Sequence, residues 1–161
     1  MIDGDSASSS ELYAVISSLS DVPIFQGIAV TGSVNQKGEI QAIGGVNEKI
    51  EGFYDVCKTR GLTGRQGVMI PTANVKHLML KQEVVEAVRQ NLFHVYPVSI
   101  ISEGIEIITG MPAGTMDANG SYPEITVYGR VQKKLKMFLK RSMEFNHLLG
   151  APHAPFFYPE Q

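Results

Sequence analysis

Two residues far apart in the sequence, a serine and a lysine, are of types that together can cleave acyl bonds. Ser6 lies in the polar run of residues 5–10, and apolar residues at helical spacing behind it predict a helix that starts at or just after Ser6. The free N–H groups and the positive dipole end of such a helix could hold the oxyanion of an acyl transfer. A serine hydroxyl is a weak nucleophile without a base, however. Taken by itself, Ser6 is better explained as a helix cap.

Lys49 is a candidate for that base, and it lies in the first turn of a second predicted helix. This helix spans residues 46–60 and ends at Gly61, a typical helix-stopping residue. Burial of the amine in an apolar pocket beside Ser6 would favour the neutral form that a general base requires. Taken by itself, a lysine at this position is more often a solvated surface residue.

The intervening and following segments predict a mixed α/β fold, with helices packed on a small mixed sheet that carries a β-hairpin. Alternating residues 27–34 and 39–43 flank a glycine-containing turn and predict the hairpin, which Gly44 and Gly45 close. Strands are expected at residues 67–71 and 92–98, helices at 83–91 and 102–109, and a loop at 72–81. The order of elements alternates as in an α/β domain.

The C-terminal part has a different composition. We predict a domain over residues 1–110, a linker over 111–123, and a basic amphipathic helix with a proline- and aromatic-rich arm over 124–161. The apolar positions of this helix are Val127, Val131, Leu135, Phe138, Leu139 and Met143. The helix could dock on a neighbouring subunit, but we favour a helix that covers its own core and turns its charges outward.

The overall composition is that of a soluble globular protein. Of the 161 residues, 43% are hydrophobic and 19% charged, and the formal net charge of -2 makes nucleic acid a poor candidate partner. The single cysteine, Cys57, predicts neither a disulfide nor a zinc site. No apolar run is long enough to predict a membrane span, and we expect a cytoplasmic location.

Other chemistries have weaker support. His77, His94, His147 and His153 have no spacing typical of metal ligands on one helix face, so we expect no metal site. A Ser-His-Asp triad stays open as an alternative, because the fold and not the sequence order brings triad members together. The sequence contains no phosphate-binding loop, and we expect no cofactor in this chain.

Two stretches resemble signatures of the proteolytic domain of the Lon family. Residues 3–8 (DGDSAS) are similar to the nucleophile motif, and residues 31–49 (TGSVNQKGEIQAIGGVNEK) are similar to the second signature. The resemblance continues through residues 68–71 and 94–98 and covers about residues 3–110. Asp5 before the serine and the serines after Ala7 look more like the B-type branch of this family.

The resemblance implies a catalytic dyad of Ser6 and Lys49, with Thr31 orienting the lysine amine. The backbone N–H groups near Asp5, Ser6 and Ala7 would stabilise the oxyanion. It further implies a serine endopeptidase that cleaves unfolded proteins in a homo-hexameric ring, with ATP and Mg²⁺ used only by a module outside this chain. Alternatives are a catalytically silent Lon-like interaction domain, and an esterase or self-processing protease.

Two features depart from the family pattern. Only residues 1–5 precede Ser6, whereas the family domain has a substantial segment there, and we interpret the chain as a fragment. In addition, ionised carboxylates of Asp3 and Asp5 close to Lys49 would stabilise its ammonium form and oppose its role as base. We expect them either to point away or to belong to a regulated, partly inactive state.

Overall fold

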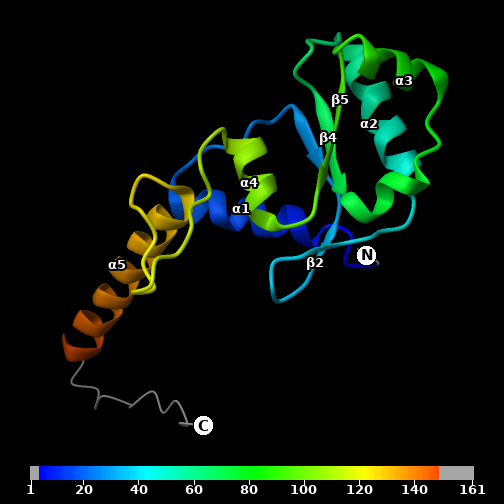
Figure 1. The fold of residues 1–161 in the computed structure, drawn as a ribbon. Coiled ribbons are helices and arrows are strands. Elements are labelled where there is room, and N and C mark those ends of the chain that lie inside the picture. Colours follow the sequence, from blue (N-terminus) through cyan, green and yellow to red (C-terminus); the bar gives the residue numbers. More distant parts are fainter. Residues whose placement is uncertain (1–3, 149–161) are drawn as a thin grey trace.

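The computed structural model describes residues 4–148 and has the predicted mixed α/β fold (Figure 1). Its centre is a three-stranded parallel sheet in the order β1-β4-β5, formed by Ile28–Val30, Gly67–Pro71 and His94–Val98. Helix α2 (Val46–Arg60) connects β1 to β4, and α3 (Gln82–Arg89) connects β4 to β5. Parallel neighbours require such crossovers, because a tight turn can join only antiparallel strands.

Strand β4 separates two apolar cores, because its side chains alternate between the faces of the sheet. Val68 and Ile70 pack with α2 and α3, whereas Met69 packs with α1 (Ser8–Ser20) and α4 (Ile101–Thr109). All three side chains are at most 1% exposed. The sheet therefore holds the N-terminal ends of α1 and α2 on opposite faces but near the same end of β1 (Figure 1).

The predicted hairpin is present but shorter than expected. The segment predicted as its first strand, residues 27–34, is divided into two strands that belong to different sheets. Residues 28–30 form β1 in the parallel sheet, and β2 (Ser33–Val34) pairs antiparallel with β3 (Ile40–Gln41). The break occurs because the N–H of Gly32 donates to the carbonyl of Ser6 at 2.9 Å and not to a strand. A Cβ on Gly32 would lie 3.0 Å from the Ile40 side chain, so a glycine suits this close approach.

The remaining elements agree with the prediction apart from their ends. Helix α2 and strand β4 have the predicted bounds, and α4 ends at Gly110, whose φ of +67° suits glycine. The predicted loop contains a 3₁₀ helix, η1 (Thr72–His77). Strand β5 begins two residues later than predicted, because the N–H groups of Leu92 and Phe93 donate to the Ala87 carbonyl at the end of α3.

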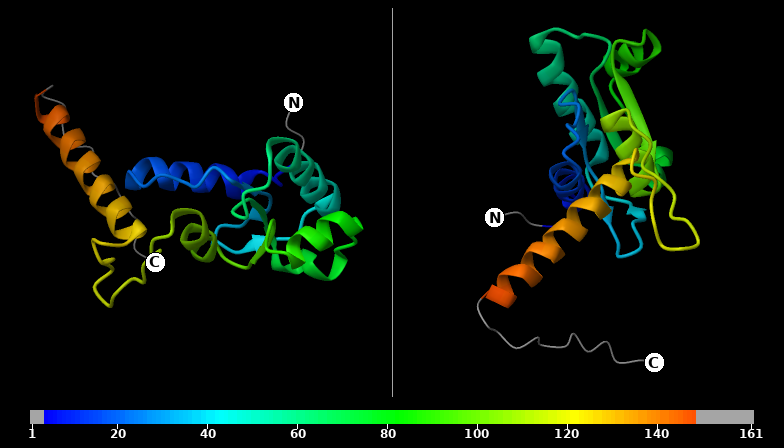
Figure 2. Two further views of the ribbon diagram at one scale, coloured as in Figure 1. Left: turned by 90° about the horizontal axis from the view of Figure 1, so that it is seen from above. Right: turned by 90° about the vertical axis from the view of Figure 1, so that its left-hand side faces the viewer.

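Helix α5 (Val127–Leu148) corrects our preferred explanation of the C-terminal segment. Its base is packed, since Val127 is fully buried and the Lys134 amine pairs with the Asp21 carboxylate at 2.7 Å. Beyond this point the helix leaves the body of the molecule (Figure 2), and Leu139 and Met143 are 59% and 54% exposed. Only the first turns therefore cover the chain's own core. The predicted arm lies outside the described residues.

No helix among residues 4–148 is long and apolar enough to cross a membrane.

Candidate active site

Ser6 lies in a tight turn immediately before α1, where the Ser8 N–H donates to the Asp5 carbonyl at 2.9 Å. The helix begins at Ser8, and the residue at its cap position is Ala7, with no side-chain cap. Ser6 is therefore not a helix cap, which corrects the simpler explanation of this residue. Its hydroxyl is available for another partner.

That partner is the amine of Lys49, whose Nζ lies 2.9 Å from Ser6 Oγ. Lys49 sits in the first turn of α2, as predicted, and its side chain spans the gap to the turn before α1. The start of α2 is held in place by Asn74, which exchanges two hydrogen bonds with the backbone of Ile43 at 2.9 and 3.0 Å. Gly45, with a φ of +66°, makes the turn into the helix.

Thr31 completes a triangle of polar atoms with these two residues. It directly follows β1 and is buried, and its hydroxyl accepts a hydrogen bond from Lys49 Nζ at 3.2 Å. The same hydroxyl donates to the Ser6 carbonyl at 3.4 Å. Thr31 thus contacts both the residue with the hydroxyl and the residue with the amine.

A cavity of about 270 Å³ opens beside the triangle. Its walls are small or apolar apart from the three polar residues and consist of Ser6, Ala7, Ala29, Val30, Thr31, Lys49 and Val68. The expected deep burial of Lys49 is not observed, since the side chain as a whole is exposed in this chain. The tip of the side chain nevertheless reaches the cavity, where Nζ contacts Ser6 and Thr31.

The turn also carries backbone donors that have no hydrogen-bond partner among the described residues. Among residues 4–148, no acceptor lies within hydrogen-bonding distance of the N–H groups of Ser6 and Ala7. Two unpaired N–H groups next to a nucleophile are the usual composition of an oxyanion hole.

The Asp5 carboxylate is paired with Ser33 and not with the lysine. It accepts a hydrogen bond from the Ser33 hydroxyl, and within the described part of the chain no carboxylate lies within 4 Å of Lys49 Nζ. For Asp5 the hydrogen bond with Ser33 supports the first alternative, a side chain that points away from the amine. Asp3 lies outside the described residues.

The histidines offer no second base. His94 Nε2 contacts the Gly64 carbonyl at 2.8 Å and begins β5, at the edge of the sheet where β1 starts, whereas Thr31 follows the end of β1. In the described ranges no histidine contacts Ser6, and no cluster of three metal-ligating side chains exists. His153 lies outside them. The geometry favours lysine over a Ser-His-Asp triad.

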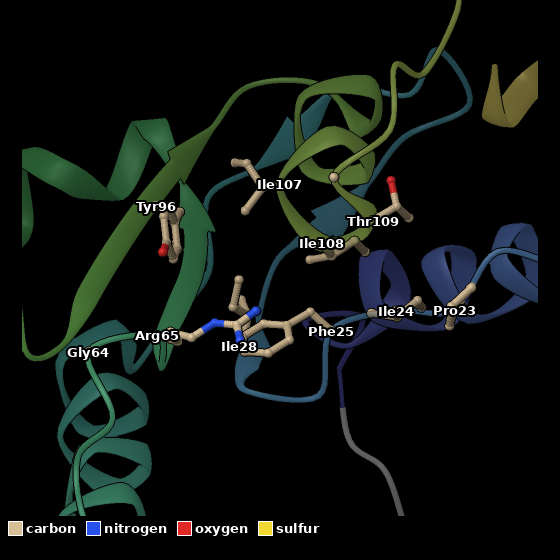
Figure 3. A pocket seen from close by; sticks show the side chains of 11 residues that line it. Pro23, Ile24, Phe25, Ile28, Gly64, Arg65, Tyr96, Ile107, Ile108 and Thr109 are labelled. Carbon is tan, nitrogen blue, oxygen red and sulfur yellow. The ribbon is translucent and has the colours of Figure 1, made fainter. Parts of the chain in front are cut away.

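A larger cavity, of about 540 Å³, lies between the segment 23–28, Tyr96 and the end of α4 (Figure 3). Arg65 stacks over the Phe25 ring at 4.7 Å from its centre. Burial raises the pKa of Tyr96, so its phenol stays protonated at neutral pH. The cavity pairs no nucleophile with a base and is a poorer candidate for hydrolysis than the smaller one.

A serine hydroxyl in contact with a lysine amine on an α/β scaffold is the kind of arrangement that Ser-Lys hydrolases use. The chain belongs to the family of the Lon protease (S16) C-terminal proteolytic domain, whose model matches residues 2–110. The predicted family is thereby confirmed.

Several relatives have names that contain the words Lon protease. A Lon protease homolog of Escherichia coli K12 is 52% identical over 68% of this chain and 19% of its own length. A homolog of Haemophilus influenzae is 45% identical over 78% of the chain and 20% of its own length. An archaeal Lon protease of Thermococcus kodakarensis is 39% identical over 66% of the chain and 15% of its own length. The matched part therefore spans about a fifth or less of each relative.

Sequence reasoning missed the side chains that fasten the site together, chiefly Ser33, Ser8 and Asn74. Ser33 is 4% exposed and Asn74 is 4% exposed. A buried polar side chain requires a partner, and a polar residue at an inward position of a predicted hairpin strand was the available signal for Ser33.

Proposed function

We propose that this chain is the proteolytic domain of a serine endopeptidase in which Ser6 is the nucleophile and Lys49 the general base. The observation that carries the proposal is the 2.9 Å contact between Lys49 Nζ and Ser6 Oγ beside a cavity. This distance is within the range for direct proton transfer.

In the first half of the reaction, neutral Lys49 takes the proton of Ser6 as its oxygen attacks the scissile carbonyl carbon. The Ser6 and Ala7 N–H groups hold the resulting oxyanion, at about 3–4 kcal/mol per donor in serine proteases. Lys49, now an ammonium, delivers the proton to the leaving amine as the peptide bond breaks. Thr31 accepts one of the ammonium's hydrogen bonds and keeps it directed at Ser6.

In the second half, water attacks the ester formed on Ser6, and Lys49 removes a proton from that water. The same proton returns to Ser6 Oγ when the acyl group departs. Every step uses groups of this chain, so we propose no metal or cofactor within it.

For the whole protein we propose ATP-dependent cleavage of unfolded proteins in the cytoplasm by a homo-hexameric ring. The nucleotide and Mg²⁺ would belong to a module outside this chain. The family and the much greater length of the named relatives support this extension.

The test is hydrolysis of a fluorescently labelled unfolded protein by the chain, beside Ser6→Ala and Lys49→Ala. Lys58→Ala is the matched control, because Lys58 is also on α2 but pairs with Glu83. We expect both site variants to lose cleavage and the control to keep it. Cleavage that survives Ser6→Ala would contradict the proposal.

Labelling of Ser6 by a fluorescent fluorophosphonate separates a defective site from a missing assembly. A parent chain that is labelled but does not cleave protein would need the rest of the polypeptide or the ring for substrate entry. A parent chain that neither cleaves nor is labelled would favour the catalytically silent interaction domain, for which the exposed apolar face of α5 is the supporting observation.

A further inference from the structure

The turn that carries Ser6 is fastened to the hairpin by side chains that take no part in the proposed chemistry. The Asp5 carboxylate accepts a hydrogen bond from Ser33 Oγ at 2.5 Å. Ser33 begins β2 and is 4% exposed, whereas Asp5 is at the surface. The bond therefore joins the residue before Ser6 to a buried strand position.

Three further hydrogen bonds join the same two segments, the turn with the start of α1 and the residues that follow Thr31. The Gly32 N–H donates to the Ser6 carbonyl at 2.9 Å, the Val34 N–H donates to Ser8 Oγ at 3.0 Å, and Ser9 Oγ donates to the Gly32 carbonyl at 2.8 Å. Together they hold the turn and the first residues of α1 along the segment that follows Thr31. Asp5 is the only charged member of this set, and hydrogen bonds to charged groups are the stronger ones.

The Asp5–Ser33 bond lies next to the triangle of Ser6, Lys49 and Thr31, so its loss would affect how these residues are placed. Asp5 is adjacent to Ser6, and Ser33 is two residues after Thr31, so their bond joins the backbones on either side of the Ser6–Thr31 contact. A change of about 1 Å in the position of a reacting group can reduce a rate about a hundredfold. Neither side chain lines the cavity beside Ser6, so neither is placed to contact a bound substrate there.

We propose that Asp5 and Ser33 are a pair of positioning residues that set Ser6 Oγ against Lys49 Nζ. This inference rests on the proposed function of Ser6 and Lys49. The competing explanation is that the Asp5 charge acts directly on the Lys49 amine across space. The two differ in what they require, since positioning needs a hydrogen-bond acceptor on residue 5 and the hydroxyl of Ser33, whereas a charge effect needs only the charge.

The experiment compares Asp5→Ala, Asp5→Asn, Ser33→Ala and Asp5→Ala/Ser33→Ala. The readout is the rate of Ser6 labelling by a fluorescent fluorophosphonate as a function of pH. We expect Asp5→Ala and Ser33→Ala each to slow labelling at least about tenfold with an unchanged pH profile. The double variant should be no slower than the slower single variant, because both remove one bond.

Asp5→Asn should restore most of the rate, because its side-chain oxygen still accepts from Ser33. The control is Ser10→Ala, which removes a bond of 2.6 Å from Ser10 Oγ to the Ala7 carbonyl within the first turn of α1. It should leave labelling within about twofold. Equal loss in Asp5→Asn and Asp5→Ala with a shifted pH profile, and no loss in Ser33→Ala, would overturn positioning in favour of the charge effect.

Amide hydrogen exchange at Gly32 tests the pair without using activity. This N–H donates to the Ser6 carbonyl, so loosening of the turn should accelerate its exchange about tenfold in Asp5→Ala and Ser33→Ala. Unchanged exchange in both would overturn the inference. A parent chain whose labelling does not depend on Ser6 would instead contradict the proposed function, and exchange at Gly32 would still decide whether the pair positions the turn.

Discussion

The Thr31 side chain contacts both residues of the proposed dyad. Its hydroxyl lies 3.2 Å from Lys49 Nζ and 3.4 Å from the Ser6 carbonyl, while its N–H donates to the Met69 carbonyl at 3.0 Å. The backbone bond fixes the residue to β4, so the hydroxyl is presented from a rigid position. A β-branched residue in a strand is common, and only its hydrogen bonds distinguish this threonine from a structural one.

Replacement of Thr31 by valine should show whether the hydroxyl of this residue matters or only its shape. Valine keeps the shape but not the hydroxyl, so we expect the hydrolysis rate to fall about tenfold or more with little change in KM. Thr31→Ser, which keeps the hydroxyl, should retain most of the activity. Steady-state kinetics of the two variants provide the measurement, and equal rates for valine and serine would show that the hydroxyl is unimportant.

At the scale of elements, α1 is placed by its packing against α4. The Tyr13 ring of α1 is buried against Gly104 of α4, where a Cβ would come 1.9 Å from the phenol oxygen. Within residues 4–148, this oxygen is the one buried side-chain polar atom without a hydrogen-bond partner. The close approach of the helices, which also fixes where the Ser6 turn begins, therefore leaves one hydroxyl desolvated and unpaired.

Tyr13→Phe should stabilise the domain by about 1 kcal/mol, because an unsatisfied buried hydroxyl costs about that much or more. Burial raises the pKa of the Tyr13 phenol above its ordinary value near 10. Below pH 10 the phenol is protonated in both the folded and the unfolded chain, so its ionisation does not affect stability. As the pH rises further, the phenol ionises first in the unfolded chain, and the folded state loses stability relative to it.

Denaturant unfolding of the parent chain and of Tyr13→Phe between pH 7 and 11 measures this difference in the free energy of unfolding. The parent should lose more stability than Tyr13→Phe above pH 10, although Tyr96 and Tyr128, whose pKa values burial also raises, add a loss common to both. A phenylalanine variant that is less stable than the parent at pH 7 would mean that the hydroxyl has a partner.

At the scale of the whole molecule, residues 4–148 form a compact α/β body and a helix that projects from it (Figure 2). The body coincides with the family match over residues 2–110, and α5 lies beyond that match. The start of α5 is tied to the segment just after α4, since the Val127 and Tyr128 N–H groups donate to the carbonyls of Pro112 and Ala113 at 3.0 and 2.9 Å. Beyond the ion pair of Lys134 with Asp21, the apolar side chains of Leu139 and Met143 are mostly exposed.

Matched substitutions at the two ends of α5 should differ accordingly. Val127→Ala should cost about 2 kcal/mol, because it removes fully buried methyl groups. Leu139→Ala, at a position that is 59% exposed, should change the free energy of unfolding by less than about 0.5 kcal/mol. Thermal or urea unfolding of the dilute chain checks both, and equal costs would show that the exposed face packs on the body.

The sequence by itself determined the family, the element order and the identities of Ser6, Lys49 and Thr31 as candidates, because these depend on local spacing and motif. Helix α2 and strand β4 were predictable to the residue, since Gly61 and the Gly67–Pro71 run are local signals. Only the tertiary structure decided that the strand breaks at Gly32, that Asp5 faces Ser33 and not Lys49, and that α5 projects beyond the core. Each of these depends on contacts between segments distant in sequence, where competing hydrogen-bond partners and available apolar surface decide the outcome and local propensity does not.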